Sequence, residues 1–313
     1  MMRREKKNNS ISRWSLIKTD FRINKSLYLL FLPVALYFAI FWYTPMYGAL
    51  IAFKNYSPRL GVMGSEWVGF DHFVRFLTSP SFFTLLGNTL RISLTSLLFG
   101  FPAPIILALL LNELRSQRFA KVVQNFTYLP HFISLVVICG MVKTFTRDTG
   151  IVTYILSLFG MEKITLLNFP EYFVPIYVGS TIWQEMGWGA IVYLAALTGV
   201  DSALYEAAMI DGAGKWKQLI HVTLPSIVPT IMIMLIMRMG GILNVGYEKI
   251  ILLYNDATLE TADVISTYVY RKGLIDQSWS FSTAVNTFNS VINLVFLCSA
   301  NFLSRKFNDS SLW

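Results

Sequence analysis

The sequence predicts an all-α integral membrane protein, and three observations support this fold class. Hydrophobic residues make up 54% of the 313 residues and charged residues only 14%, whereas a soluble domain usually carries about 25% charged residues. Several long intervals contain no charge and are long enough to cross a bilayer as helices. Lys and Arg residues are also distributed unevenly among the segments that would connect these helices.

The spacing of charged residues predicts six transmembrane helices. A spanning helix needs roughly 20 mainly apolar residues to cross the hydrocarbon core of a bilayer. Five intervals contain no charge, as between Lys25 and Lys54, and one of these ends at Arg238; in a sixth interval the only charge is Glu185. The predicted spans are residues 27–48, 88–111, 124–145, 172–198, 225–245 and 281–303.

The distribution of basic residues predicts that both termini lie in the cytoplasm. With this orientation the inner segments contain 15 Lys and Arg residues and the longer outer segments contain 8. Lys and Arg are retained preferentially on the cytoplasmic side of a membrane. The net charge of +8 is therefore explained by topology, and no nucleic-acid partner is needed.

This topology divides the chain into three parts. Residues 1–26 form a cytoplasmic N-terminal segment, residues 27–303 a six-span domain, and residues 304–313 a cytoplasmic tail. Within the first part, apolar residues at helical spacing among basic ones predict a helix that lies on the inner leaflet. These apolar residues are Ile11, Trp14, Ile17 and Phe21.

Metal and catalytic motifs are not recognisable in the sequence. Cys139 and Cys298 lie in separate apolar runs without a Cys-x-x-Cys spacing, so neither a disulfide framework nor a zinc site is predicted. His72, His131 and His221 are scattered over both sides of the predicted membrane and a span end. Neither H-E-x-x-H nor G-x-S-x-G occurs, which argues against an intramembrane enzyme.

The inner segment 199–224 is too long and too patterned for a simple return loop. Asp201 or Ser202 is expected to cap a short helix, with Glu206 in its early turns, where the helix dipole favours a carboxylate. Gly212 and Gly214 then end this helix, because glycine adopts strained turn geometry at low cost. A second short helix is expected to lead to the next span. The segment therefore predicts a small helix across the cytoplasmic mouth, shaped to fit a groove in a partner protein.

The same segment resembles a known motif. Glu206-Ala207-Ala208, then Gly212, then Leu224-Pro225 match the EAA motif, E-A-A-x3-G-x9-I-x-L-P, of ABC importer permeases. Val222 is the one departure, where the motif has Ile. Further stretches are similar to the LplB-like branch of the maltose-type, binding-protein-dependent sugar permeases: TPMYGALIAFKNYSP, WVGFDHFVRF, FPAPIILALLLNELR and TYLPHFIS.

The resemblance implies a type I ABC importer permease fold with a cytoplasmic coupling helix in the loop 201–225. It implies that this loop docks on an ATPase subunit, and the corresponding coupling residues are Glu206, Ala207, Ala208, Asp211, Gly212, Leu224 and Pro225. The implied partners are a second permease subunit in a heterodimer, two ABC ATPase subunits and an extracytoplasmic solute-binding protein. The implied location is the bacterial cytoplasmic membrane, and the implied substrate is a sugar or oligosaccharide.

A competing nucleotide-binding motif fails at two positions. Gly212-Ala213-Gly214-Lys215 resembles the end of a phosphate-binding loop. Such a loop also needs glycine where Met209 stands, and serine or threonine where Trp216 stands. The chain is therefore expected to bind no cofactor itself, and ATP and Mg²⁺ are expected to be used by the partner ATPase.

The later spans contain candidate residues for a substrate pathway. Aromatic faces and amide groups suit sugars, which present apolar C–H faces between hydroxyl groups. Such residues also join helices or form interfacial belts, and both interpretations stay open at this point. The candidates are Trp183, Gln184, Glu185, Tyr193, Asn244, Tyr247, Asn289 and Asn293.

Charged residues in or near the spans extend this hypothesis. An ionisable group within a span is costly and indicates function or a buried partner. Arg91 and Lys143 lie close enough to span ends to extend toward water, whereas Arg238 is expected to pair with Glu185 or with a partner subunit. The additional cations suggest an acidic, uronate-type oligosaccharide. The alternative is a single-chain secondary transporter, which would more often show two related halves.

Overall fold

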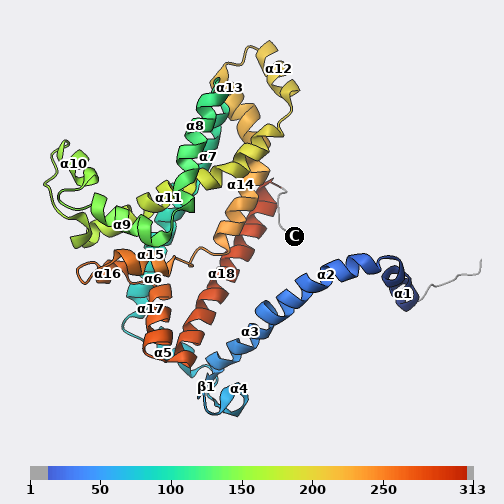
Figure 1. The fold of residues 1–313 in the computed structure, drawn as a ribbon, viewed down its shortest axis with the longest axis vertical. Helices are drawn as coiled ribbons and strands as arrows, with labels where there is room; N and C mark the ends of the chain where they lie inside the picture. Colours follow the sequence, from blue (N-terminus) through green and yellow to red (C-terminus); the bar gives the residue numbers. More distant parts are fainter. Residues whose placement is uncertain (1–12, 309–313) are drawn as a thin grey trace, which may run out of the picture.

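The computed structural model describes residues 13–308, almost all of which belong to helices or the turns between them (Figure 1). Ile11 and the last residues of the predicted tail, 309–313, lie outside the described residues. Two short strands, β1 (Lys54–Asn55) and β2 (Glu66–Trp67), pair antiparallel after the first span. The helices are α1 (Arg13–Ile23), α2 (Lys25–Phe38), α3 (Thr44–Met46), α4 (Gly61–Gly64), α5 (Asp71–Leu77), α6 (Phe82–Thr95), α7 (Pro102–Asn112), α8 (Gln117–Tyr128), α9 (Leu135–Phe145), α10 (Ile151–Ser157), α11 (Pro170–Thr198), α12 (Ser202–Ile210), α13 (Lys215–Gln218), α14 (Leu224–Met239), α15 (Tyr247–Leu253), α16 (Leu259–Ala262), α17 (Ile265–Tyr270) and α18 (Trp279–Asn308).

Short 3-10 and π-helical turns join several of these helices into longer ones. Four continuous helices in the described chain are long and apolar enough to cross a membrane: Lys25–Phe53, Phe82–Asn112, Lys215–Met239 and Trp279–Lys306. Two bent pairs pass this test only when each pair is taken together: Gln117–Phe132 with Leu135–Phe145, and Pro170–Thr198 with Ser202–Ile210. The described helices therefore give four spans, or up to six if each bent pair is one span, and six is the number that the charge spacing predicts.

The third span, predicted over 124–145, is sharply bent in the structure. The chain turns by 105° between the helix that ends at Phe132 and the helix that begins at Leu135. Pro130 lies in the 3-10 turn before the break, and Ser134 starts α9 by accepting a hydrogen bond from the backbone N–H of Val137. The spacing of charged residues shows how long an apolar segment is, but it does not show whether the helix in that segment bends.

The fifth span begins earlier than predicted. The expected separate short helix is continuous with the span, so one helix runs over Lys215–Met239 instead of 225–245. Pro225 has no backbone N–H to continue the regular pattern, and a π-helical turn at Leu219–Thr223 directly precedes it. The helix then ends before Gly240 and Gly241.

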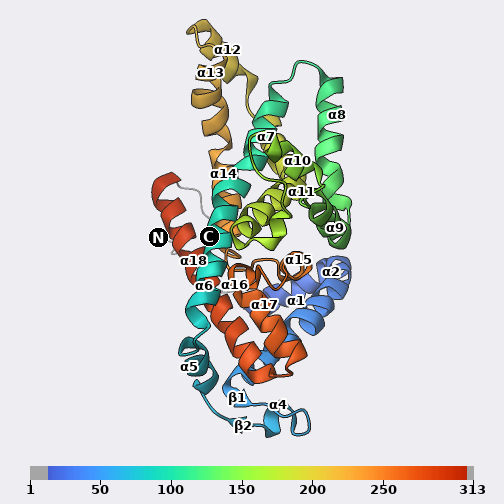
Figure 2. The same cartoon turned by 90° about the vertical axis from the view of Figure 1, so that its left-hand side faces the viewer.

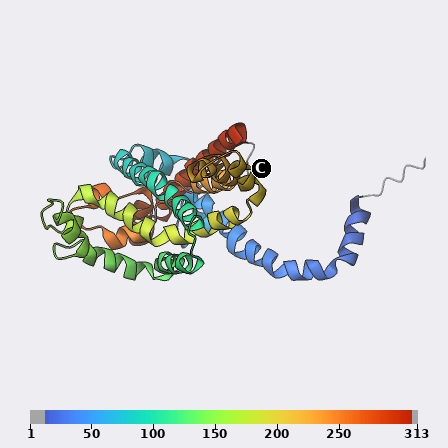
Figure 3. The same cartoon turned by 90° about the horizontal axis from the view of Figure 1, so that it is seen from above.

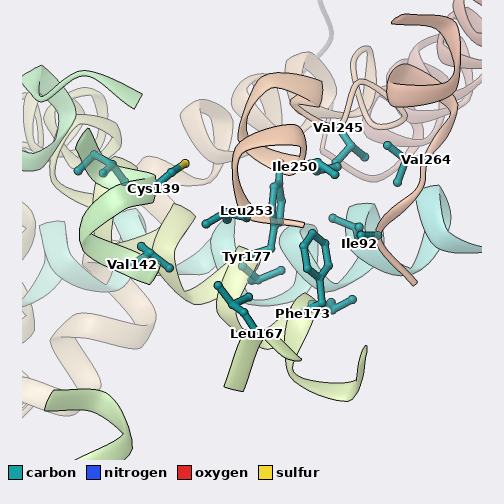
Figure 4. Packing of buried hydrophobic residues seen from close by; sticks show 14 residues of the cluster. Ile92, Cys139, Val142, Leu167, Phe173, Tyr177, Val245, Ile250, Leu253 and Val264 are labelled. Atoms are coloured by element: carbon teal, nitrogen blue, oxygen red, sulfur yellow. The ribbon is translucent and has the colours of Figure 1, made fainter. Parts of the chain in front are cut away.

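A buried core holds α15 against the middle of the molecule. Figure 4 shows side chains of α6, α9, α11 and α15 packed together, including Ile92, Cys139, Tyr177 and Ile250. Ile92 and Ile250 are completely buried. As a result, α15, which follows the fifth span, lies against α9 and α11.

Most of the first span stands apart from the other helices, as Figures 1 and 3 show, and its end at Tyr47–Phe53 packs against α18. No residue of α2 is buried, and large apolar side chains such as Leu30 and Phe41 are exposed. In Figure 2, α12 and α13 lie at one end of the long axis, and β1, β2 and α4 lie at the other. The predicted coupling loop and the first outer segment are therefore at opposite ends of the molecule.

Candidate functional site

A cavity of about 480 Å³ lies among α7, α11 and α14. Its wall is mainly apolar and contains one carboxylate, from Glu185, and one guanidinium, from Arg238. Further lining residues are Ser96, Gly100, Phe101, Pro104, Val178, Thr181, Ile182, Met186, Trp188, Gly189, Tyr193, Met234 and Met237. The combination of small and aromatic residues with two opposite charges makes this the candidate pathway.

Glu185 is paired with a histidine that the sequence did not indicate as a partner. His131 Nδ1 lies 2.9 Å from Glu185 Oε2. The imidazole ring also stacks on Trp188, with ring centroids 4.6 Å apart and an interplanar angle of 2°. These contacts hold the carboxylate and the imidazole in fixed positions at the cavity.

The expected pair between Glu185 and Arg238 is not formed. Among the described residues, Arg238 makes no ion pair, although both side chains line the same cavity. The carboxylate is already occupied by His131, which comes from the bend between α8 and α9. Arg238 therefore presents a positive charge without a carboxylate partner among the described residues.

A close backbone contact holds that bend against α11. A Cβ atom added at Gly187 would overlap the backbone carbonyl of Thr127, near the end of α8. The chain can make this approach only because Gly187 has no side chain. The contact lies between the two α11 residues, Glu185 and Trp188, that hold His131, so the three interactions form one junction, the α8–α11 clamp.

The other candidates on α11 point in different directions. Tyr193 is buried and lines the main cavity. Gln184 is buried, and its Oε1 lies 3.4 Å from Lys249 Nζ. Trp183 lines a second, apolar cavity of about 540 Å³ formed mainly by α9, α10 and α11. The structure therefore does not bring Trp183 together with Glu185.

The three asparagines form a cluster between the fifth and sixth spans. Asn244 Oδ1 accepts hydrogen bonds from Asn289 Nδ2 at 2.9 Å and from Asn293 Nδ2 at 3.0 Å. Asn293 Oδ1 also accepts one from the backbone N–H of Leu243. The asparagines therefore join the end of the fifth span to the sixth span, which is one of the two structural roles considered for polar residues in spans.

Tyr247 lies outside the main cavity wall. Its ring stacks on Tyr270 at 5.5 Å between centroids, and its hydroxyl donates to Glu248 Oε1. The Glu248 carboxylate raises the pKa of Tyr247 above its usual value, mainly through charge repulsion of the phenolate. Of the eight pathway candidates, Glu185 and Tyr193 line the main cavity.

The loop between α11 and α14 forms the expected short helix, α12. Asp201 caps it by accepting a hydrogen bond from the Ala203 N–H at 2.9 Å, and Gly212 follows it with φ of 75°. Glu206 lies beyond the first turn of α12, so the expected support from the helix dipole is weak there. Glu206 and Asp211 are both exposed.

Side chains attach this loop to the base of α14. The hydroxyl groups of Tyr205 and Thr223 lie 3.0 Å apart, and Gln218 donates to the carbonyl of Ala213. No residue of α12 is buried, and the large apolar side chains Ile210 and Trp216 are 86% and 76% exposed. These contacts hold the loop at the start of α14, and the loop exposes an apolar surface at Ile210 and Trp216.

The described part of the chain contains no cluster of three or more His, Cys, Asp or Glu residues that could hold a metal ion.

The family model described as "Binding-protein-dependent transport system inner membrane component" matches residues 100–309. The chain belongs to this family of ABC importer permeases. The permease is therefore a multi-pass membrane protein and a transport subunit, which agrees with the resemblance of its EAA motif.

Several known proteins are similar to the permease over nearly their whole length. Protein LplB of Bacillus subtilis is 45% identical over 97% of this chain and 94% of its own. The polygalacturonan/rhamnogalacturonan transport system permease protein YteP of the same organism is 46% identical over 92% and 90%. A crystal structure of a bacterial ABC transporter involved in the import of the acidic polysaccharide alginate matches with a TM-score of 0.85 and 47% identity, over 93% of this chain and 99% of that one.

A second structure of the alginate transporter, in complex with an alginate pentasaccharide-bound periplasmic protein, matches with a TM-score of 0.86 and 46% identity, over 94% of this chain and 99% of that one. The description of the matched family likewise names dependence on a binding protein. Family membership also separates the permease from the alternative of a single-chain secondary transporter.

Proposed function

We propose that the permease forms half of the translocation pathway for an acidic, uronate-type oligosaccharide. The observation that carries this proposal is the charge balance of the main cavity. Glu185 is paired with His131, whereas Arg238 makes no ion pair among the described residues. A carboxylate on the substrate would complete this arrangement.

The relatives support the same substrate class. One of the similar permeases is named for polygalacturonan and rhamnogalacturonan transport, and the similar crystal structures belong to an importer of alginate. Glu185 and Arg238 are both exposed in the cavity, and an unpaired cation beside apolar walls of low polarisability attracts a carboxylate more strongly than one in bulk water. The aromatic ring of Trp188 and the apolar wall suit the C–H faces of sugar rings.

We further propose that α12 docks on one of two ABC ATPase subunits. The exposed apolar side chains at the tip of the loop need cover that the described chain does not supply, and these are Leu204, Met209, Ile210 and Trp216. The EAA residues Glu206, Ala207, Ala208 and Gly212 lie on the same short helix or at its end. In this arrangement ATP and Mg²⁺ bind to the ATPase subunits, and the permease binds neither.

The substrate proposal can be tested with the complete transporter. The permease, its second subunit, the ATPases and the solute-binding protein are purified together and reconstituted in proteoliposomes. We expect a binding protein loaded with an oligouronate to stimulate ATP hydrolysis and to deliver the labelled sugar. Stimulation by a neutral oligosaccharide alone would contradict the acidic substrate class.

Removal of either member of the Glu185–His131 pair should impair transport without preventing assembly. We expect Glu185→Ala and His131→Ala each to lower the uptake rate by about tenfold or more, since each variant leaves the other residue without its hydrogen-bond partner. Trp183→Ala is the matched comparison, because this residue faces the second cavity from the same helix. Uptake per assembled complex is measured, and equal losses in all three variants would argue against a pathway specific to the main cavity.

The proposed orientation places both termini and α12 in the cytoplasm of the bacterial membrane. We expect a cysteine introduced at Ile210 to resist a membrane-impermeant thiol reagent in intact cells and one at Met63 to react, since both side chains are exposed on the protein surface. Cys139 and Cys298 are first replaced by alanine. The cells lack the ATPase subunits, so that the proposed docking does not cover Ile210, and permeabilised cells serve as the control in which both positions react. Labelling of the Ile210 variant from outside would contradict this topology.

A further inference from the structure

Lys249 is a buried lysine that the transport site does not yet account for. It lies on α15, between the fifth and sixth spans, and is 5% exposed. Its Nζ donates to Thr181 Oγ1 at 2.9 Å and to Gln184 Oε1 at 3.4 Å. It also lies 5.6 Å from the ring centroid of Tyr177. These three contacts are all with α11.

None of these partners neutralises the ammonium charge. Among residues 13–308, no carboxylate oxygen forms an ion pair with Lys249. A buried cation is usually paired with an anion, because neutral hydrogen-bond acceptors only partly replace its hydration. An apolar residue on α15 would pack against α11 without this cost. The cost of keeping a charge here points to a role for the charge itself.

Lys249 is separated from the main cavity by a single side chain. Thr181, which accepts its hydrogen bond, is one of the residues that line the cavity. The cavity carboxylate of Glu185 is already held by His131. The positive charges of Lys249 and Arg238 therefore exceed the negative charge available to neutralise them in this region of the chain.

We infer that Lys249 is a specificity-determining residue, whose fixed positive charge behind Thr181 favours anionic sugars in the cavity. This inference rests on the proposed function. Arg238 is part of the cavity wall, whereas Lys249 lies behind it. Lys249 would therefore attract an anionic sugar by its electric field and not by direct contact. Field effects of this kind stay strong where the surroundings are poorly polarisable and counter-ions are excluded.

The charge of Lys249 can be separated from its hydrogen bonds by substitution. Lys249→Met removes both, Lys249→Gln removes the charge but keeps a donor, and Lys249→Arg keeps the charge. We expect both neutral variants to lower oligouronate uptake per assembled complex by about tenfold, with Lys249→Arg restoring it to within about twofold of wild type. Lys272→Met is the matched control, since Lys272 lies in the same connecting segment, is partly exposed and is paired with Asp276.

Each result of this experiment has a defined meaning. Normal uptake by Lys249→Met and Lys249→Gln, or an equal loss in Lys249→Arg, would overturn the inference. It would also be overturned if both neutral variants failed to assemble while Lys249→Arg assembled, because the residue would then serve helix packing. A wild-type transporter that carries no oligouronate at all would instead contradict the proposed function.

Discussion

Replacement of Gly212 by valine is expected to abolish most transport while the spans remain inserted in the membrane. Gly212 has φ of 75°, a conformation that costs an ordinary L-residue roughly 1–2 kcal/mol. The space around it is open, so the strain arises from the backbone and not from a clash. Relief of this strain would redirect α12, and the ATPase would dissociate or hydrolyse ATP without regard to the binding protein. Uptake should fall by about tenfold or more, in line with the sensitivity of positioned groups to small displacements.

Two comparisons make this test specific. Gly214→Val introduces the same side chain two residues away, where the backbone has an ordinary φ of −69° and the surroundings are also open. Gly212→Asn introduces a side chain that tolerates the left-handed conformation. Both should stay much closer to wild type in uptake and in stimulated ATPase activity. Full uptake and normal ATPase regulation in Gly212→Val, at normal expression, would remove the main support for the coupling role of this loop.

Replacement of Gly187 by alanine is expected to disrupt the α8–α11 clamp. The added methyl group would overlap the backbone carbonyl of Thr127, and backbone cannot move aside as a flexible side chain can. Displacement of α8 would separate His131 from Glu185 and from Trp188. We expect a loss of several kcal/mol in stability, as for other overpacked interiors, seen as a large decrease in the amount and thermal stability of the assembled complex.

Gly179→Ala is the matched control for Gly187→Ala. Gly179 lies on the same helix, and a Cβ atom there would meet no other atom within 4 Å. The control should assemble in near-normal amounts, with any effect limited to the second cavity that it lines. Normal thermal stability of Gly187→Ala would show that α8 and α11 are not held together in the way described.

The features that the sequence predicted well are those set by local interactions. Charge-free intervals located the helices, because the length of an apolar segment can be counted directly in the sequence. The cap at Asp201 and the turn at Gly212 were also predictable, since each depends on a few consecutive residues. The bend after Phe132 was missed, although Pro130 and Ser134 were visible signals for it.

The candidate pathway was harder to predict because it depends on which face of α11 meets which neighbour. Trp183 and Glu185 are two residues apart, and the structure places them at different cavities. The pairing of Glu185 with His131 joins residues 54 positions apart. Lys249 lies in a connecting segment, where a charged residue is common, so its burial could not be predicted from the sequence.

The continuous helix from Lys215 to Met239 has a mechanical consequence. It begins beside the coupling loop and ends at the cavity, where Met237 and Arg238 form part of the wall. At a rise of 1.5 Å per residue, about 35 Å separates Lys215 from Arg238. A tilt of about 10° at the loop would therefore shift the guanidinium end by about 6 Å, if the helix turned as a rigid rod. The π-helical turn at Leu219–Thr223 lies close to the pivot, so the full displacement reaches the cavity only if this turn does not bend.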